Sequence, residues 1–325
     1  MVAPAGGSAL SADVAELRQL DEEAREAARN AVTGSTKRAY TYDWRCFESW
    51  CTGHGVGAMP ASARTLRAYI RHMAKGGFKA ATIRRALMTI GRAHRHAEHE
   101  PATADEKVLA TLHGTLREIG VLQKAARPFS PDDLRKAHVK LGSDLHGLRD
   151  RALSALCFTG AFRRSEVVSL DVADLDFRAD GKLLVTLRRS KTDQLGAGRK
   201  VPISRGQHEE TCPVRAVQAW LMAAGITEGP VFRAFSRHGK LTDERSSDQT
   251  VYRLAKTLAI LAELPDPESY SGHSFRAGFV TTANRCGKSE SKIMDVTGHR
   301  DRRTLQRYIR DTELFKNNAS DDIGM

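Results

Sequence analysis

The sequence predicts a mainly α-helical chain of two domains, with a small antiparallel β-sheet inside the second. Leucine, alanine and arginine are common and aromatic residues make up only 6%, a composition that favours helix over sheet. Apolar residues recur at helical spacing along most of the chain, whereas the pattern turns to strands after Leu170, with strand-like alternation over 182–188 and a return at 201–203. A length of 325 residues suits two domains of roughly 100–200 residues each.

Residues 1–34 are expected to form a tail and a helix. Residues 1–11 are small and glycine-rich, which favours disorder, and Ser11 can cap a helix over about 12–32. This helix has a narrow apolar stripe and many acids, so it is either solvated or docked on a neighbouring subunit. Residues 1–30 carry a net charge of −3, against +8 for 31–125 and +7 for 126–325.

Residues 35–120 are predicted to form a basic, all-helical domain. The expected helices run from Ser35 or Thr36 to near Gly53, from Pro60 and Ser62 to about Lys75, from about Ala80 to Glu98, and from about Asp105 to Ile119. One face of the first helix carries Tyr40, Trp44, Phe47 and Cys51. This stripe is more typical of a core than of a base-stacking platform.

Three histidines near residue 96 invite a metal-binding interpretation. His94, His96 and His99 do not share one helical face, however, so a basic helix end is the favoured interpretation.

Residues 121–130 are predicted to be a basic linker, and residues 131–325 the second domain. Ser130 caps a helix with Pro131 at its first position, and residues 148–158 are apolar and helical. Lys182–Arg188 and Val201–Ile203 form a hairpin around a loop at 191–199. Helices are expected from about Cys212 to the end.

The net charge of +12 and the sequence pI near 9.7 indicate a polyanionic partner, although a merely basic protein would show the same balance. Five cysteines without a CxxC motif suggest reduced thiols in the cytoplasm. No run approaches ~20 apolar residues, so no membrane span is predicted. The N-terminus also lacks the pattern of a secretory signal.

Three segments of the second domain carry polar residues that a plain fold would not need. FTGAFRRSEVVSL places Arg163 and Glu166 on one helix face, where a local salt bridge is the simplest explanation. SGHSFRAGF carries His273 and Arg276, and TGHRDRRTLQRYIR carries the remaining pair, His299 and Tyr308. Each segment alone is a weak signal.

Together these residues suit transesterification of a phosphodiester. Guanidinium groups bind two oxygens at once and keep their charge, so Arg163 and Arg276 could hold a phosphate. Lys191 could protonate the leaving oxygen, and His273 or His299 could transfer protons. Tyr308 would be the nucleophile. The chain has no Walker sequence, acidic metal motif or zinc spacing, so neither a cofactor nor a metal is predicted.

The order of these motifs resembles the tyrosine recombinase, or phage integrase, family, and within it the Cre-type recombinases most closely. GHSFRAG matches the Cre-type HxxR box, with Ala277 where many phage integrases carry a second histidine. AATIRRALMTIGRAHR resembles the DNA-facing helix of Cre-type core-binding domains. The resemblance covers roughly residues 35–315, and implies a core-binding domain followed by a catalytic domain.

The resemblance also implies a role for each residue. Arg163 and Arg276 bind the scissile phosphate, Glu166 supports the geometry, and Lys191 is the general acid. His273 assists proton transfer, His299 occupies a slot held by His or Trp, and Tyr308 forms a 3′-phosphotyrosine. Arg164 is an alternative to Arg163, and Lys200 to Lys191; Glu166 and the sequence RRSKT favour the first of each pair.

The expected partner is double-stranded DNA with inverted-repeat half-sites, bound by a homotetramer. Candidate DNA contacts are Arg38, Arg45, Arg84 and Arg85 in the first domain, and Tyr252 and Arg253 in the second. The C-terminal tail, with Leu314, Phe315 and Ile323, is expected to dock on the next protomer, and the N-terminal helix to make a similar exchange.

Two other functions remain open. A type IB topoisomerase uses similar chemistry to relax supercoils as a monomer, and a catalytically silent DNA-binding protein could use the same scaffold. The separate helical domain and the HxxR box favour recombination over the first, and the full catalytic set argues against the second.

Overall fold

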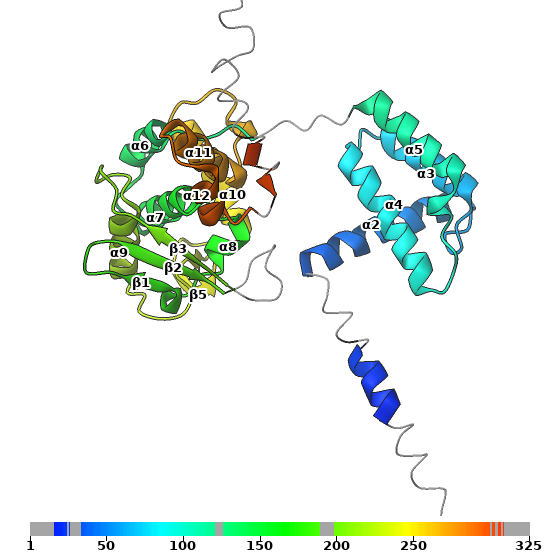
Figure 1. Ribbon diagram of the computed structural model, residues 1–325, viewed down its shortest axis with the longest axis horizontal. Coiled ribbons are helices and arrows are strands. Elements are labelled where there is room, and N and C mark those ends of the chain that lie inside the picture. Colours follow the sequence, from blue (N-terminus) through cyan, green and yellow to red (C-terminus); the bar gives the residue numbers. More distant parts are fainter. Residues whose placement is uncertain are drawn as a thin grey trace, which may run out of the picture. The chain divides into compact units, whose positions relative to one another are not determined.

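Helices make up most of the chain in the computed structural model, and short antiparallel strands supply the remaining regular structure (Figure 1). The structure describes residues 16–24, 26, 34–120, 126–188, 198–299, 301–302, 305–306 and 308. The chain divides into two units, Met1–Gln123 and Lys124–Met325. Each unit has its own hydrophobic core.

The first unit is a helical domain whose helices start where the sequence offers caps. Its elements are α2 (Gly34–Gly53), α3 (Ala63–Lys75), α4 (Ala80–His96), η1 (Ala102–Ala104) and α5 (Glu106–Ile119). Ser62 accepts a hydrogen bond from the backbone of Thr65 at 3.1 Å, and Asp105 caps α5 in the same way. α3 packs against α5, and α2 against α4.

The aromatic face of α2 belongs to the core of the first unit, as predicted. Phe47 and Cys51 are buried, and Trp44 packs at the edge of the same cluster. Of the three histidines, His96 and His99 are exposed. His94 departs from the expected basic helix end, because it is buried: Nδ1 donates to the Ile90 carbonyl and Nε2 accepts from the Ala61 amide, both at 2.8 Å.

The N-terminal segment is helical over residues 16–24, and its described side chains are exposed. The rest of the helix expected over 12–32 lies largely outside the described residues. Among the helices in the part of the chain that the structure describes, none is long and apolar enough to cross a membrane.

The second unit combines several helices with a small sheet. Its helices are α6 (Pro131–Lys140), α7 (Leu145–Thr159), α8 (Arg164–Val168), α9 (Pro213–Ala223), α10 (Asp248–Leu261), α11 (Gly272–Arg285) and α12 (Glu290–Thr297), with the short turns η2 (Val172–Asp174) and η3 (Pro267–Ser269). α7 lies at the centre and packs against α9 and α11. Ser130 forms a capping box with Asp133 ahead of α6, with Pro131 at its first turn as predicted.

The predicted hairpin is present as part of a three-stranded antiparallel sheet, β1 (Leu175–Phe177), β2 (Leu183–Leu187) and β3 (Arg199–Ile203). Leu187 pairs with Arg199 and Leu183 with Ile203. Alternate residues of β2 and β3 enter the core, including Val185 and Val201, which are fully buried. The sheet therefore has one face in the core, as the alternation predicted.

The prediction of uninterrupted helices after Cys212 was wrong. A second hairpin, β4 (Arg233–Phe235) and β5 (Leu241–Arg245), separates α9 from α10. These strands are short and β5 is mostly polar, so they lack the alternation that marks a strand in sequence. Backbone pairing and a 2.5 Å ion pair between Arg233 and Asp243 hold them together. β1 lies where the pattern was expected to turn to strands after Leu170, but a strand of three residues was not delimited from the sequence.

Close packing fixes α11 against the segment that precedes α6. A Cβ atom at Gly278 would lie 2.1 Å from the Phe129 carbonyl oxygen, so only glycine fits there. The Phe129 amide donates to the Ser274 carbonyl at 3.2 Å, and its ring stacks on Phe275. This contact seats the helix that carries His273 and Arg276.

Candidate active site

Arg163 and Glu166 form a buried pair at the start of α8. The Arg163 guanidinium donates from Nη1 to Glu166 Oε1 at 2.5 Å, and the Arg163 amide donates to Oε2 at 2.9 Å. The Glu166 side chain is only 2% exposed. Arg164 instead faces Asp248 at 3.6 Å, so the neighbour of Glu166 is Arg163, as the three-residue spacing predicted.

Arg276 enters the same region from α11. Its side chain is 2% exposed, and Nη1 donates to the Ala161 carbonyl at 2.6 Å. Ala161 has a φ of 47°, a left-handed conformation that costs a non-glycine residue of order 1–3 kcal/mol. The turn before Arg163 is therefore held in an unfavourable conformation with its carbonyl directed at Arg276.

Arg163 and Arg276 bring two positive charges close together at a site that little water reaches. Burial, and then the charge of Arg163, lower the pKa of Arg276 to about 10, against a smaller opposing effect of Glu166. Among the residues that the structure describes, Nη2 of Arg276 has no hydrogen-bond partner although it is buried. A phosphate oxygen would satisfy this donor and offset the repulsion between the guanidinium groups.

His299 and Tyr308 lie together beside these arginines. Their rings are 6.3 Å apart, centroid to centroid, and Tyr308 packs against a cluster that includes Val280, Ile293 and Leu305. Tyr308 is close enough to Arg276 for its charge to affect the pKa of that arginine. The structure therefore brings Tyr308 close to the motif residues Arg276 and His299.

Burial, and then Arg276 and Arg163, lower the pKa of His299 to about 4, so its ring is neutral at pH 7. His299 Nδ1 lies 2.9 Å from the Thr297 hydroxyl. His273 is exposed in the first turn of α11, and its charge also affects His299. Both histidines are thus near the arginines.

Lys191, the expected general acid, lies outside the described residues. Its alternative, Lys200, is exposed, and the strand alternation puts it on the opposite face of β3 from Arg199. Because Arg199 faces Glu166 at 3.7 Å, Lys200 points away from the site.

Arg199 itself is a residue that the sequence analysis missed, because it fell within the predicted loop at 191–199. Its side chain is 18% exposed and it contacts both Glu166 and the last turn of α12. The signal was its spacing: it stands two residues before Val201 and four before Ile203, on the buried face of the strand.

The candidate DNA contacts differ in their surroundings. Arg38, Arg45 and Arg84 are exposed on α2 and α4. Arg85 is held in a two-point ion pair with the buried Asp43, at 2.7 and 2.9 Å, which joins α4 to α2. Any DNA contact by Arg85 would come from a guanidinium that Asp43 already engages.

In the second unit, Tyr252 is half-buried and Arg253 is exposed. The ring of Tyr252 lies under the charges of Arg164 and Lys256, at 5.9 and 5.0 Å from its centroid. In the described part of the chain, no group of three or more His, Cys, Asp or Glu side chains is arranged to hold a metal ion.

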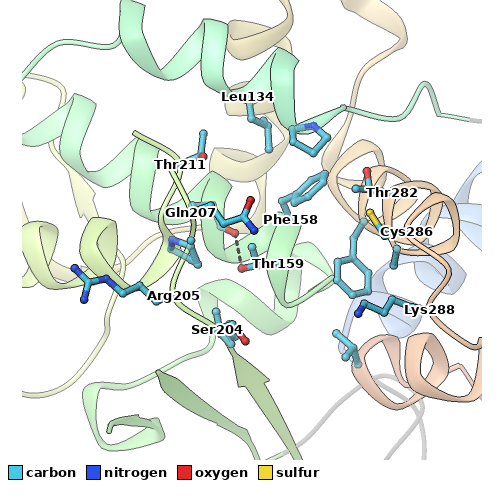
Figure 2. Close-up of a pocket in the computed structure, with 18 of the residues that line it drawn as sticks. Leu134, Phe158, Thr159, Ser204, Arg205, Gln207, Thr211, Thr282, Cys286 and Lys288 are labelled. Carbon is cyan, nitrogen blue, oxygen red and sulfur yellow. Dashed lines mark hydrogen bonds between the residues drawn. The ribbon is translucent and has the colours of Figure 1, made fainter. Parts of the chain in front are cut away.

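A pocket of about 650 Å³ opens elsewhere on the second unit (Figure 2). It lies between α6, α7, the end of β3, α11 and α12, and none of the catalytic candidates that the structure describes lines it. Its walls are largely apolar, with Leu134, Phe158 and Ile293 among them. Figure 2 shows Arg205 and Gln207 on one side of the pocket and Lys288 on the other.

Known proteins match the chain over both units. The model of the phage integrase family matches residues 131–314. The integrase/recombinase XerD homolog of Selenomonas ruminantium is 36% identical over 306 residues, which cover 93% of this chain and 89% of that protein. Recombinase Cre of Escherichia phage P1 is 22% identical over 303 residues, covering 88% and 86%.

Solved structures share the fold. The Tn1549 transposon integrase in complex with circular intermediate DNA has a TM-score of 0.60 and 18% identity, covering 88% of this chain and 92% of that one. The lambda integrase dimer bound to a COC′ core site has a TM-score of 0.54 and 15% identity, covering 90% and 94%. With the family match and the XerD homolog, these findings mean that the chain belongs to the phage integrase family of tyrosine recombinases, enzymes that cleave and rejoin DNA strands.

Proposed function

We propose that this protein is a site-specific recombinase that exchanges DNA strands through a 3′-phosphotyrosine on Tyr308. The observation that carries the proposal is the meeting of Tyr308 with Arg276 and His299, beside the Arg163–Glu166 pair. Among the described residues, the buried Nη2 of Arg276 has no partner, and a nucleophile next to such a donor is what attack on a phosphodiester requires.

In the first step, the Tyr308 hydroxyl oxygen attacks phosphorus and the bond from phosphorus to the 5′ oxygen breaks. Arg163 and Arg276 stabilise the charge that grows on the non-bridging oxygens, and His299 donates to one of them. The tyrosine proton passes to His273, and Lys191 protonates the departing 5′ oxygen. Glu166 keeps Arg163 in place through its two hydrogen bonds.

In the second step, a 5′-hydroxyl from a partner strand gives its proton to Lys191 and attacks the phosphotyrosine. The bond from phosphorus to the Tyr308 oxygen breaks, and His273 returns a proton to that oxygen. Each step replaces one phosphoester bond by another, so the bond energy is kept in the phosphotyrosine. The exchange therefore uses no nucleotide cofactor, and the residues above account for every proton moved.

The proposed partner is a pair of inverted-repeat DNA sites held by four copies of the chain. Arg38, Arg45 and Arg84, together with Arg253, are exposed and available to contact DNA, and the net charge of +12 favours a polyanion. Arg85 and Tyr252 remain proposed contacts of the same kind. The N-terminal helix, exposed over 16–24, is proposed to dock on a neighbouring copy.

The C-terminal tail is the second proposed link between copies. Leu314, Phe315 and Ile323 lie outside the described residues, and they need an apolar site on a neighbour. The pocket between α6, α7, α11 and α12 is the proposed acceptor, because its walls are apolar and it does not overlap the catalytic residues.

The decisive test of the chemistry is covalent capture of DNA. Wild-type protein is incubated with synthetic duplexes that carry randomised inverted repeats around a nicked spacer, and adducts that survive detergent are sequenced. We expect wild type to form such adducts and Tyr308→Phe to form none while still retarding the same duplexes in gels. No adduct from wild type on any duplex would refute the enzyme and leave a DNA-binding protein.

The captured duplex then separates recombination from topoisomerase activity. Two copies of it on one plasmid should yield recombinant products, which a monomeric relaxing enzyme does not form. Relaxation of a plasmid that lacks the site, without recombinants from a plasmid that carries two, would favour the topoisomerase instead.

Deletion of residues 312–325 tests the assembly. The truncated protein should bind a single half-site as wild type does but lose cooperative binding to the paired site. A labelled peptide of residues 312–325 should bind the truncated protein in fluorescence anisotropy. Equal loss on single and paired sites, or no peptide binding, would contradict docking of the tail in the pocket.

A further inference from the structure

Arg199 is a partly buried cation that the proposed chemistry does not use. It opens β3, where it shares a face with the buried Val201 and Ile203 rather than with the exposed Lys200. Its side chain is therefore directed into the unit, toward the candidate active site, and only 18% of it is exposed.

One end of the Arg199 guanidinium faces the Glu166 carboxylate. Nη2 lies 3.7 Å from Glu166 Oε2, the oxygen that also accepts the Arg163 amide. Glu166 Oε1 is held by the Arg163 guanidinium. A single buried carboxylate is thus flanked by arginines from two different elements, α8 and β3.

The other end of the guanidinium is attached to the C-terminal turn of α12. Nη1 donates to the Val296 carbonyl and faces the Asp295 carbonyl at 3.5 Å. These carbonyls carry the negative end of the helix dipole, which favours a cation there. A Cβ atom at Gly298 would lie 3.1 Å from the guanidinium, so the chain turns closely around it.

The end of α12 matters because two catalytic candidates depend on it. His299 follows Gly298 directly, and Tyr308 packs in the cluster that contains Ile293 and Met294 of α12. A movement of this helix end would shift the nucleophile and its neighbour relative to Arg163.

The position of Arg199 costs free energy of folding, so stability by itself does not explain it. Burial lowers its pKa, and so does the charge of Arg163, although Glu166 acts in the opposite direction. Among the described residues, its Nη2 is buried without a hydrogen-bond partner. An uncompensated donor of this kind is normally avoided in a core and is concentrated at functional sites.

We propose that Arg199 is a positioning residue for DNA cleavage, which ties the end of α12, and with it His299 and Tyr308, to the Arg163–Glu166 pair. The inference rests on the proposed function, because it concerns the rate of that same reaction.

The test uses the full chain and the duplex captured by wild type. Arg199→Gln removes the tie, and Arg178→Gln is the matched control, because Arg178 is an exposed arginine paired with Asp176 at the edge of the same sheet. We expect Arg199→Gln to lower the single-turnover rate of adduct formation about a hundredfold, the usual effect of misplacing reacting groups by about 1 Å. Affinity for the duplex should change less than about threefold. Arg178→Gln should match wild type in both.

Modified phosphates show how Arg199 acts. A methylphosphonate at the cleavage position lacks one charged oxygen, so it restores variants that have lost a charge-neutralising group, and Arg276→Gln serves as the positive control. A 5′-phosphorothiolate leaves as a thiolate, so it restores variants that have lost the general acid. For a positioning residue, the ratio of the Arg199→Gln rate to the wild-type rate should be the same on all three substrates.

Each alternative result overturns the inference. Recovery on the methylphosphonate would place Arg199 on the phosphate, recovery on the phosphorothiolate would place it on the leaving group, and a wild-type rate would leave it without a role. If Arg199→Gln does not fold, Arg199→Lys decides: one ammonium cannot reach both Glu166 and α12, so a loss of about tenfold is expected, and a wild-type rate refutes it. Failure of wild type to form any adduct would refute the proposed function instead.

Discussion

The protonation of His299 determines what this side chain can do in the reaction. Burial and the neighbouring arginines lower its pKa to about 4, so the neutral ring carries one N–H at pH 7. The Thr297 hydroxyl lies 2.9 Å from Nδ1 and 3.4 Å from the Met294 carbonyl. If it donates to the nearer Nδ1, the ring proton resides on Nε2. In the proposed reaction His299 is then a hydrogen-bond donor to the phosphate rather than an acid or a base.

A donor role makes His299→Trp and His299→Ala differ. The indole N–H of tryptophan can only donate, so His299→Trp should keep adduct formation within about tenfold of wild type, whereas His299→Ala should lose roughly a hundredfold or more. Single-turnover rates between pH 6 and pH 8 give the comparison. An inflection near pH 6.5 in wild type that is absent from His299→Trp would show that His299 titrates, contrary to the lowered pKa.

Sequence reasoning could propose the candidate catalytic residues because their motifs are local. Arg163 caps the helix that carries Glu166, three residues further on, and the structure joins their side chains at 2.5 Å. It missed Arg199 because the role of that residue depends on contacts across more than 90 residues, to Asp295 and Val296. Spacing along the chain places Arg199 on the buried face of its strand but does not reveal which distant groups it contacts.

Among the elements, α11 must satisfy two requirements at once, because it presents candidate site residues and packs closely against the backbone. It presents His273 and Arg276 on one side, and on another side it approaches the backbone of Phe129. The helices were predicted well because their caps and periodicity are local, as at Ser62 and Ser130. The hairpin β4–β5 was not predicted, since its short and polar strands are defined by pairing rather than by pattern.

The contact of α11 predicts opposite effects for two helical glycines. Gly278→Ala would place a methyl group 2.1 Å from the Phe129 carbonyl oxygen, so the helix must shift, and we expect a loss of roughly 1–3 kcal/mol in the free energy of unfolding. Gly114→Ala in α5 meets no atom within 4 Å and should stabilise by roughly 0.5–1 kcal/mol.

Tryptophan fluorescence separates the two substitutions during denaturation in urea. Trp220 is the only tryptophan of residues 124–325, whereas Trp44 and Trp50 lie in the first unit. Single-tryptophan backgrounds therefore report each unit by itself. A Gly278→Ala protein as stable as wild type would mean that α11 can shift away from Phe129 at little cost. The packing would then fix the position of Arg276 less rigidly than expected.

For the molecule as a whole, a buried histidine makes the stability of the second unit depend on pH. His138 is 1% exposed, and its ring contacts the Glu210 carbonyl and the Ser154 hydroxyl. Burial lowers its pKa to about 4, against an opposing effect of the Glu210 contact. Between pH 6.5 and pH 4 the unfolded chain therefore binds a proton at this position that the folded chain does not, so stability falls as the pH falls.

The size of the effect follows from the two pKa values. Relative to pH 7, the contribution of His138 at pH 5 should be less favourable by about 2 kcal/mol. His138→Gln does not titrate, and its amide can still donate to the Glu210 carbonyl and contact the Ser154 hydroxyl, so it should remove that part of the pH dependence. Urea denaturation followed through Trp220 at pH 7 and pH 5 measures it for both proteins. Equal pH dependence in the two proteins would mean that His138 is protonated in the folded unit. The interface between α6 and α7 would then accommodate a charged imidazole.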